Sequence, residues 1–138
     1  MSGAGYSGTP LAKKLGLKPG MRAWFLDMPD SVRAEIDVEN LGLSQQAAPF
    51  AGIEAAHIFV TRRDDLAREI AALRQLLAPA GFVWISWPKK AAKTDTDITE
   101  NTIREVALPI GLVDIKVCAV DEKWSGLKLV IRKSLRTP

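Results

Sequence analysis

The chain has 138 residues, 47% of them hydrophobic and 25% charged, which is the composition of one globular domain. Its single cysteine, Cys118, excludes an internal disulfide framework and favours a reducing compartment. No apolar run approaches the roughly 18 residues that span a bilayer, and the first residues lack the apolar core of a signal peptide. The lone cysteine and the lack of a signal-peptide pattern predict a cytoplasmic, bacterial protein. The net charge of +3 is spread along the chain, which indicates a solvated basic surface.

The N-terminal part predicts a short helix and a strand. Residues 1–9 are rich in Gly and Ser and are expected to be flexible. Thr9 is a candidate N-cap and Pro10 a first helical residue, so a short helix is expected as far as Leu15. After a Pro-Gly turn, an apolar run predicts a buried strand over residues 21–26.

The next segment gives the weakest pattern of the chain. A short helix is expected over residues 32–36, after a Pro-Asp-Ser start signal. Beyond it, a brief strand is expected near residues 38–41 and a helical turn over residues 45–50.

The middle of the chain gives the clearest pattern, a strand, a helix and a second strand. An apolar run with β-branched and aromatic residues predicts a strand over residues 56–61. Leucine and isoleucine at three- and four-residue spacings predict a helix over residues 64–77. Pro79-Ala80-Gly81 is expected to end this helix, and residues 82–87 form the second strand. This unit predicts two parallel strands with a right-handed crossover.

The C-terminal part predicts one more helix and a hairpin. A helix is expected over residues 98–108, with Asp97 as its cap. Strands are expected over residues 112–120 and 127–131, antiparallel to each other, before a basic tail (132–138) that is expected to be frayed. Four side chains of the first strand are expected to share one face: Val113, Ile115, Val117 and Ala119. Four aromatic residues are expected in the core: Trp24, Phe59, Phe82 and Trp84.

The order of these elements predicts the fold class. Strands that alternate with helices imply a mostly parallel sheet, and the terminal hairpin adds an antiparallel strand. We therefore predict a single α/β, Rossmann-like domain over residues 1–138.

Two motifs resemble class I S-adenosylmethionine-dependent methyltransferases. In that superfamily, Leu-x-Leu-Lys-Pro-Gly precedes the first strand, as residues 15–20 do here. A helix that ends Leu-Leu-x-Pro-x-Gly precedes a later strand, as residues 76–81 do here. The resemblance implies a methyltransferase-like sheet and S-adenosylmethionine as a possible cofactor.

The segment after the first strand departs from that superfamily. The resemblance implies an acidic residue followed by a Gly-rich loop, which lets the backbone approach the cofactor. Asp27 is present, but Met28 and Pro29 follow it and no Gly does. The chain is also shorter than a typical catalytic member, which has a further strand–helix unit. These departures favour a module that does not transfer methyl groups.

Three segments together resemble a family of small bacterial proteins known as a domain of unknown function. They are residues 6–16, residues 83–89 and residues 123–130, with the tryptophans and lysines that they contain. This resemblance covers essentially the whole chain. It implies the fold and the length, and it implies no activity.

Ligands of open parallel sheets bind beyond the carboxyl ends of the strands, where the strand order reverses. This rule nominates residues 27–31, 61–64 and 86–90, which we call the rim. The candidate ligand-binding residues of the rim are Asp27, Arg62, Arg63, Ser86, Trp87 and Lys89. The cations among them suit a phosphate or a carboxylate. In the alternative interpretation, Asp64 caps its helix and the cations are solvated.

Several other features have two interpretations. The segment from Tyr6 to Lys14 either holds an anion with main-chain N–H groups or is a capped helix. His57 and Cys118 lack partners that would indicate a metal or a catalytic pair, so buried structural roles are expected. Trp87 and Trp124 either stack on a base or sugar or pack between loop and sheet.

Three functions are compatible with these patterns. We expect a non-catalytic or degenerate methyltransferase-like module that binds a small anionic or nucleotide-like ligand at the rim. One alternative is a divergent methyltransferase in which Asp27 contacts S-adenosylmethionine. The other is a protein- or nucleic-acid-interaction module that uses Lys13, Lys14 and the basic tail. No metal or membrane partner is expected, and the oligomeric state is left open.

Overall fold

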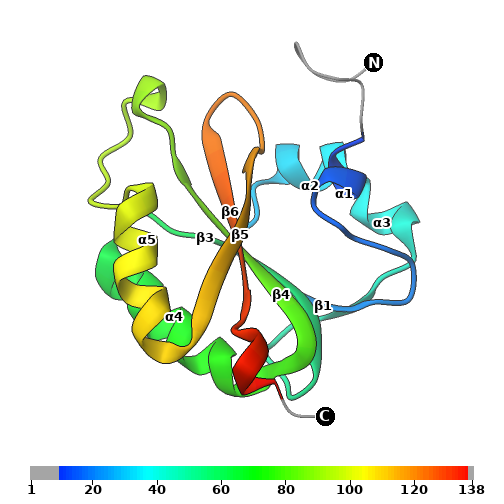
Figure 1. Cartoon of the computed structure of the whole chain (residues 1–138). Helices are drawn as coiled ribbons and strands as arrows, with labels where there is room; N and C mark the ends of the chain where they lie inside the picture. Colours follow the sequence, from blue (N-terminus) through cyan, green and yellow to red (C-terminus); the bar gives the residue numbers. More distant parts are fainter. Residues whose placement is uncertain (1–9, 137–138) are drawn as a thin grey trace.

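The structure, a computed structural model, describes residues 10–136. A six-stranded sheet lies between two helical layers, with α4 and α5 on one face and α1, α2 and α3 on the other (Figure 1). The strands are β1 (Arg22–Leu26), β2 (Ser44–Gln46), β3 (Ile53–Phe59), β4 (Leu77–Pro88), β5 (Leu112–Ala119) and β6 (Trp124–Ile131). The α-helices are α1 (Leu11–Lys14), α2 (Asp30–Ile36), α3 (Val38–Leu41), α4 (Arg63–Leu76) and α5 (Glu100–Ala107). The 3₁₀ turns are η1 (Lys90–Ala92), η2 (Leu108–Ile110) and η3 (Lys133–Leu135).

The sheet confirms the predicted fold class. Its strand order is β2-β1-β3-β4-β6-β5. The first four strands in this order are parallel, whereas β6 is antiparallel to both β4 and β5. The chain is therefore a single α/β domain with a mostly parallel sheet and a C-terminal antiparallel hairpin. The predicted βαβ unit is confirmed as β3, α4 and β4.

Two apolar layers hold the helices on the sheet. Leu66, Ile70 and Leu73 of α4 are buried in one layer, as their spacing predicts. In the other layer, the buried Trp84 of β4 donates its Nε1–H to the main-chain oxygen of Leu15, at 2.8 Å, which ties the end of α1 to the sheet. All four aromatic residues predicted in the core are buried: Trp24, Phe59, Phe82 and Trp84.

Two elements before residue 50 differ from their predictions. Residues 38–41, predicted as a strand, form α3, and the strand is β2, which overlaps the start of the stretch predicted as a helical turn. The three residues of β2 are polar and exposed, at the edge of the sheet beside β1. Because such a strand has no apolar alternation, the sequence pattern gives no signal for it.

The segment Pro79-Ala80-Gly81, predicted to follow the helix as a turn, lies inside β4. This strand begins directly after α4 ends at Leu76. A Cβ atom at Gly81 would lie 2.6 Å from the main-chain oxygen of Ile53 on β3. The glycine therefore permits a close approach of two strands, next to a shift in their register.

The cap of α5 also differs from its prediction. Asp97, expected to cap this helix, accepts a hydrogen bond of 2.7 Å from the main-chain N–H of Arg63, at the start of α4. Thr99 caps α5 instead, and its side chain forms a capping box with Thr102.

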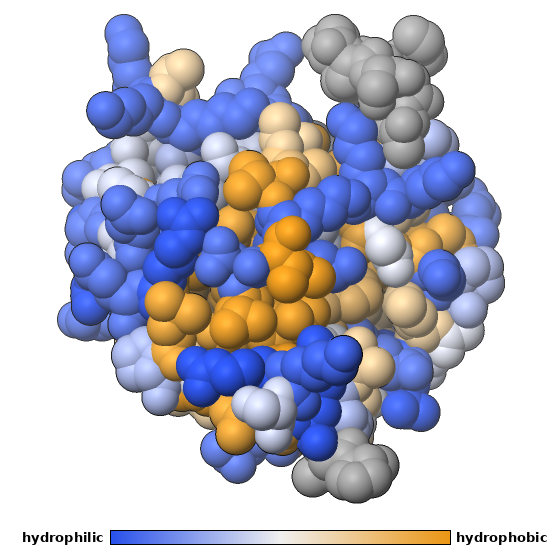
Figure 2. Space-filling model, viewed as in Figure 1, coloured by the Kyte–Doolittle hydropathy of each residue, from blue (hydrophilic) through white to orange (hydrophobic). Residues whose placement is uncertain are grey.

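A bulge interrupts β5 and changes which way its side chains face. Before the bulge, Val113 lies opposite Val130, which belongs to the layer under α1. After it, Val117 lies opposite Leu127, which belongs to the layer under α4. Because directly opposed residues share a face, the prediction that the apolar residues of β5 share one face is wrong. Ile115 and Val117 are 57% and 55% exposed, and Figure 2 shows an apolar patch on the side of the molecule that carries β5.

The two ends of the described chain are short helical turns. Thr9, the expected N-cap, and the rest of residues 1–9 lie outside the described residues, and Pro10 occupies the N-cap position of α1. At the other end Arg136, which follows η3, donates from its Nε to the main-chain oxygen of Ile131, the last residue of β6, at 2.9 Å. Within residues 10–136, none of the helices combines the length and the apolar character needed to cross a membrane.

Candidate functional site

The rim lies where the strand order reverses. Strand β1 pairs with β2 on one side and with β3 on the other, so the connections leave this point in opposite directions. Open α/β sheets bind ligands outside the carboxyl ends of the strands at such a point, which here means the ends of β1 and β3. The predicted segments 27–31 and 61–64 follow these two strands, and 86–90 includes the end of β4.

The turn after β1 is formed by side-chain-bearing residues. Asp27 is exposed and has a φ of 54°, in the left-handed region. Met28 is partly buried against the layer under α1. Pro29 occupies the N-cap position of α2 with extended backbone angles, and it supplies no N–H. The turn therefore presents side chains, rather than bare backbone, at the reversal point.

Arg62 is paired with a carboxylate of the loop that precedes α5. Its Nη2 lies 2.6 Å from Oδ2 of Asp95, and the hydrogen bond with Asp95 raises the pKa of Arg62. Both side chains are solvent-exposed, Asp95 by 84%. Arg62, not Asp64, occupies the N-cap position of α4, so the alternative prediction for Asp64 is wrong.

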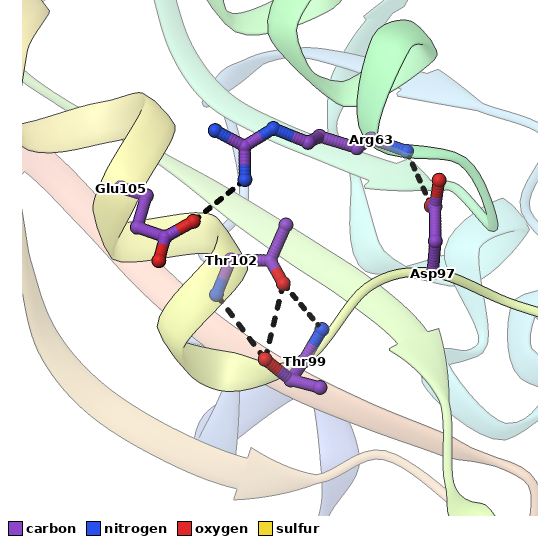
Figure 3. Close-up of polar contacts among 5 residues, drawn as sticks. All are labelled: Arg63, Asp97, Thr99, Thr102 and Glu105. Atoms are coloured by element: carbon purple, nitrogen blue, oxygen red, sulfur yellow. Dashed lines mark hydrogen bonds and ion pairs between the residues drawn. The ribbon is translucent and has the colours of Figure 1, made fainter.

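Arg63 is held by two carboxylates (Figure 3). Its main-chain N–H donates to Asp97, and its Nη1 lies 2.6 Å from Oε1 of Glu105 on α5. The capping box of Thr99 and Thr102, with hydrogen bonds of 3.0 and 3.2 Å between their main-chain N–H groups and side-chain oxygens, fixes the start of α5 beside this pair. Both arginines of the rim are thus paired with carboxylates of the same chain.

Ser86 and Trp87 are the two predicted rim residues that do not reach the surface. Both are buried, and the Ser86 Oγ is 2.7 Å from Nε2 of His57. Burial lowers the pKa of His57 to about 3, so its ring is neutral at pH 7. Its Nδ1 is buried and has no hydrogen-bond partner among residues 10–136. The ring stacks on Phe59, with the centroids 4.4 Å apart.

The pair of His57 and Ser86 is absent from the sequence predictions. In the parallel register of β3 and β4, His57 is opposite Trp84 and Phe59 is opposite Ser86. His57 and Phe59 share a face of β3, as Trp84 and Ser86 do on β4, because residues two apart on a strand point to the same side. The sequence therefore places His57 and Ser86 on adjacent strands, but the pairing itself depends on the register, which tertiary structure sets.

Lys89 is one of two rim cations, with Lys90, that lie outside the ion pairs of residues 10–136. Its main-chain N–H donates to the oxygen of Lys123 at 2.8 Å, while its ammonium group forms no ion pair within the described residues 10–136. Trp124, beside Lys123, is buried and meets the Phe59 ring edge-on at 5.1 Å. The packing interpretation of Trp87 and Trp124 is therefore confirmed.

The six predicted rim residues thus fall into two groups. The structure brings Asp27, Arg62, Arg63 and Lys89 to the surface and places the other two below it. Their role in ligand binding stays a prediction. Cys118 is a buried thiol whose pKa is raised by burial, and residues 10–136 contain no cluster of His, Cys, Asp and Glu that could hold a metal ion.

Solved methyltransferase structures share this fold. A S-adenosylmethionine-dependent methyltransferase from Aquifex aeolicus is 16% identical, with a TM-score of 0.61 over 88% of this chain and 87% of that one. A putative type 11 methyltransferase from Sulfolobus solfataricus is 14% identical, with a TM-score of 0.56 over 93% of each chain. Fibrillarin from Aeropyrum pernix, solved with bound S-adenosyl-L-methionine, is 14% identical, with a TM-score of 0.54 over 87% of this chain and 73% of that one. At these identities the likeness shows the fold alone.

The turn after β1 does not fit S-adenosylmethionine in the way that a glycine-rich turn does. A cofactor that lies against the backbone requires residues without side chains and free N–H groups. Here Met28 and Pro29 fill the turn, and Asp27, rather than a glycine, adopts the left-handed conformation. No chemical step through this cofactor follows from the residues present.

Sequence comparison places the chain in a family. Among curated proteins, no relative was found by sequence. The model of one family, described as protein of unknown function (DUF3052), matches residues 12–133, which is most of the chain. The protein belongs to this DUF3052 family.

Proposed function

We propose that the protein is a non-catalytic methyltransferase-fold module that binds a small anionic or nucleotide-like ligand at its rim. The observation that carries this proposal is the turn after β1, where Asp27, Met28 and Pro29 stand in place of a glycine-rich loop. A turn of this kind removes the backbone surface that the superfamily presents to its cofactor.

The size of the sheet supports the loss of catalysis. The edge beyond β1 consists of the three-residue strand β2, and the chain enters β3 after only a short loop. Within residues 10–136, this edge therefore lacks the further strand–helix unit expected of a catalytic member. Its absence leaves less protein around the reversal point to enclose a substrate and exclude water.

The charges of the rim support an anionic ligand. Arg62 and Arg63 project at the start of α4, and Lys89 lies at the end of β4. The carboxylate that now holds Arg62 belongs to Asp95, which is exposed, and exposed ion pairs contribute little to stability. A phosphate can therefore replace Asp95 on the guanidinium and gain a bidentate geometry.

A thermal-shift titration tests the proposal. The probes are S-adenosylmethionine, S-adenosylhomocysteine, ATP and inorganic phosphate. A ligand at 100 times its Kd stabilises a fold by about 2.7 kcal/mol, which corresponds to a shift in Tm of roughly 10 °C for a domain of this size. We expect a saturable shift with ATP or phosphate and none with the two methionine derivatives.

Matched variants locate the site. The double variant Arg62→Gln/Lys89→Gln should show a smaller shift than the wild type at each concentration of ATP or phosphate, whereas Arg68→Gln, which removes an exposed arginine paired with Asp65 elsewhere on α4, should keep the full shift. A shift with S-adenosylmethionine would support the divergent-methyltransferase alternative. A shift in the double variant as large as that of the wild type would refute the rim as its location.

A further inference from the structure

Three lysines gather on the α1 side of the hairpin, away from the rim arginines. Lys116 on β5 and Lys128 on β6 are directly opposite each other in the antiparallel ladder. Lys18, which follows α1, is close enough to Lys128 for its charge to lower the pKa of that residue. We call these three residues the lysine cluster. Like charges directly opposite each other destabilise an antiparallel pair, so this arrangement has a cost in the protein alone.

The packing of Lys128 and Lys116 fixes their ammonium groups. Lys128 is half-buried, with its Nζ 4.2 Å from the centroid of the Phe82 ring. Gly16 lies beside it with a φ of 75°, and a Cβ atom added there would be 3.3 Å from this Nζ. Lys116 donates from its Nζ to the main-chain oxygen of Lys14 at 3.1 Å, at the end of α1. Backbone and ring contacts therefore hold two of the three cations in place.

The charged groups that affect the pKa values of Lys128 and of the nearby Cys118 are all lysines. Every ion pair found between residues 10 and 136 uses an arginine. Burial lowers the pKa of Lys128, and the charges of Lys116 and Lys18 lower it further. The neighbouring Cys118 is affected in the same sense, because lysines oppose the rise that burial causes in the pKa of its thiol. Two groups on this face thus experience a positive potential.

We propose that the lysine cluster is a second anion site, which binds a phosphate-class oxyanion, either free or as the phosphoryl group of a larger molecule. Ammonium groups act as point charges with three donors each, so they accept such an anion in several orientations. The bound anion removes the repulsion between Lys116 and Lys128. This inference does not depend on the rim, whose cations follow β3 and β4.

The experiment compares stability and binding in the same variants. In low-salt buffer, the full chain is titrated with inorganic phosphate, pyrophosphate and ATP, and the melting temperature and Kd are measured. Lys116→Glu places an opposite charge across from Lys128. The free variant should therefore melt about 1–4 °C above the wild type, because a repulsive cross-strand pair becomes attractive. Its Kd for pyrophosphate should rise at least 10-fold.

Two further variants keep the test decisive. Lys133→Glu makes the same change in charge on the exposed turn η3 and should bind pyrophosphate as the wild type does. Lys128→Met retains apolar packing on Phe82 without the charge and should also lose binding. Equal Kd values for inorganic phosphate and ATP would indicate that the site binds a free anion. A much lower Kd for ATP would indicate that it binds the phosphoryl group of a larger molecule.

Two results would overturn the inference. One is a wild-type Kd for pyrophosphate in Lys116→Glu. The other is an equal rise of the Kd for pyrophosphate in Lys133→Glu and in Lys116→Glu, which would show that binding responds to net charge alone. The rim variant Arg62→Gln/Lys89→Gln separates the two sites, because it should retain the pyrophosphate binding that depends on Lys116.

Discussion

Protonation of His57 should destabilise the fold at mildly acidic pH. Burial lowers the pKa of this residue from 6.5 to about 3 in the folded chain. The neutral ring is therefore the folded form, and its contribution to stability is complete above pH 6.5. That contribution falls as the pH drops from 6.5 towards 3, because the unfolded chain binds the proton first.

The size of the effect follows from the difference between the two pKa values. Each unit corresponds to about 1.4 kcal/mol, so the loss approaches about 5 kcal/mol below pH 3. At pH 5 the same linkage removes about 2 kcal/mol from the free energy of unfolding relative to pH 8. Urea denaturation of the wild type and of His57→Gln at pH 8, 6 and 5 measures it. Glutamine can keep a hydrogen bond to Ser86 without titrating. Between pH 8 and pH 5, the free energy of unfolding of His57→Gln should therefore fall by about 2 kcal/mol less than that of the wild type.

The chain contains one histidine, which allows a second measurement on the wild type. The NMR signals of the His57 ring should show no titration between pH 8 and pH 5 while the protein is folded. A ring that titrates near pH 6.5, or a variant with the same pH dependence as the wild type, would refute the reasoning.

Three substitutions test the packing and capping that position the two sites. Gly81→Ala should cost about 1–3 kcal/mol in urea denaturation, because the new Cβ would lie 2.6 Å from the oxygen of Ile53; an unchanged midpoint would show that β3 and β4 separate freely. Trp84→Phe should lower the free energy of unfolding by about 1–3 kcal/mol or more, since it removes the donor to the buried oxygen of Leu15, and faster hydrogen exchange in α1 should accompany it. Thr99→Ala should cost about 1 kcal/mol, and Thr99→Ser should restore most of it, because serine also forms the capping box; equal stability of the two variants would contradict this role.

The β3–α4–β4 unit was predictable from the sequence. Its apolar runs have the period of strands, and the spacing of Leu66, Ile70 and Leu73 has the period of a helix. These are properties of one continuous segment. The same holds for the two strands of the hairpin and for the glycine-free turn after β1, which already indicated a departure from the methyltransferase pattern.

The polar contacts of the rim could not be predicted in this way. Asp97 was expected to cap the helix next to it, but its partner is the N–H of Arg63, 34 residues earlier in the chain. Arg62 was predicted at the rim, and only the structure shows that Asp95 holds it. Local capping rules consider neighbours along the chain, whereas these carboxylates reach α4 through the packing of a separate loop.

Strand register decides the remaining features. The bulge in β5 reverses which face its later residues occupy, and the opposition of Lys116 and Lys128 depends on that register. His57 and Ser86 meet for the same reason, across two strands that the sequence separates by a helix. Most of the strands and helices could be assigned from the sequence, because the period of apolar residues is a property of one continuous segment. The pairs of side chains that face each other depend on the tertiary structure, because a shift of one residue in register moves every side chain of a strand to the other face.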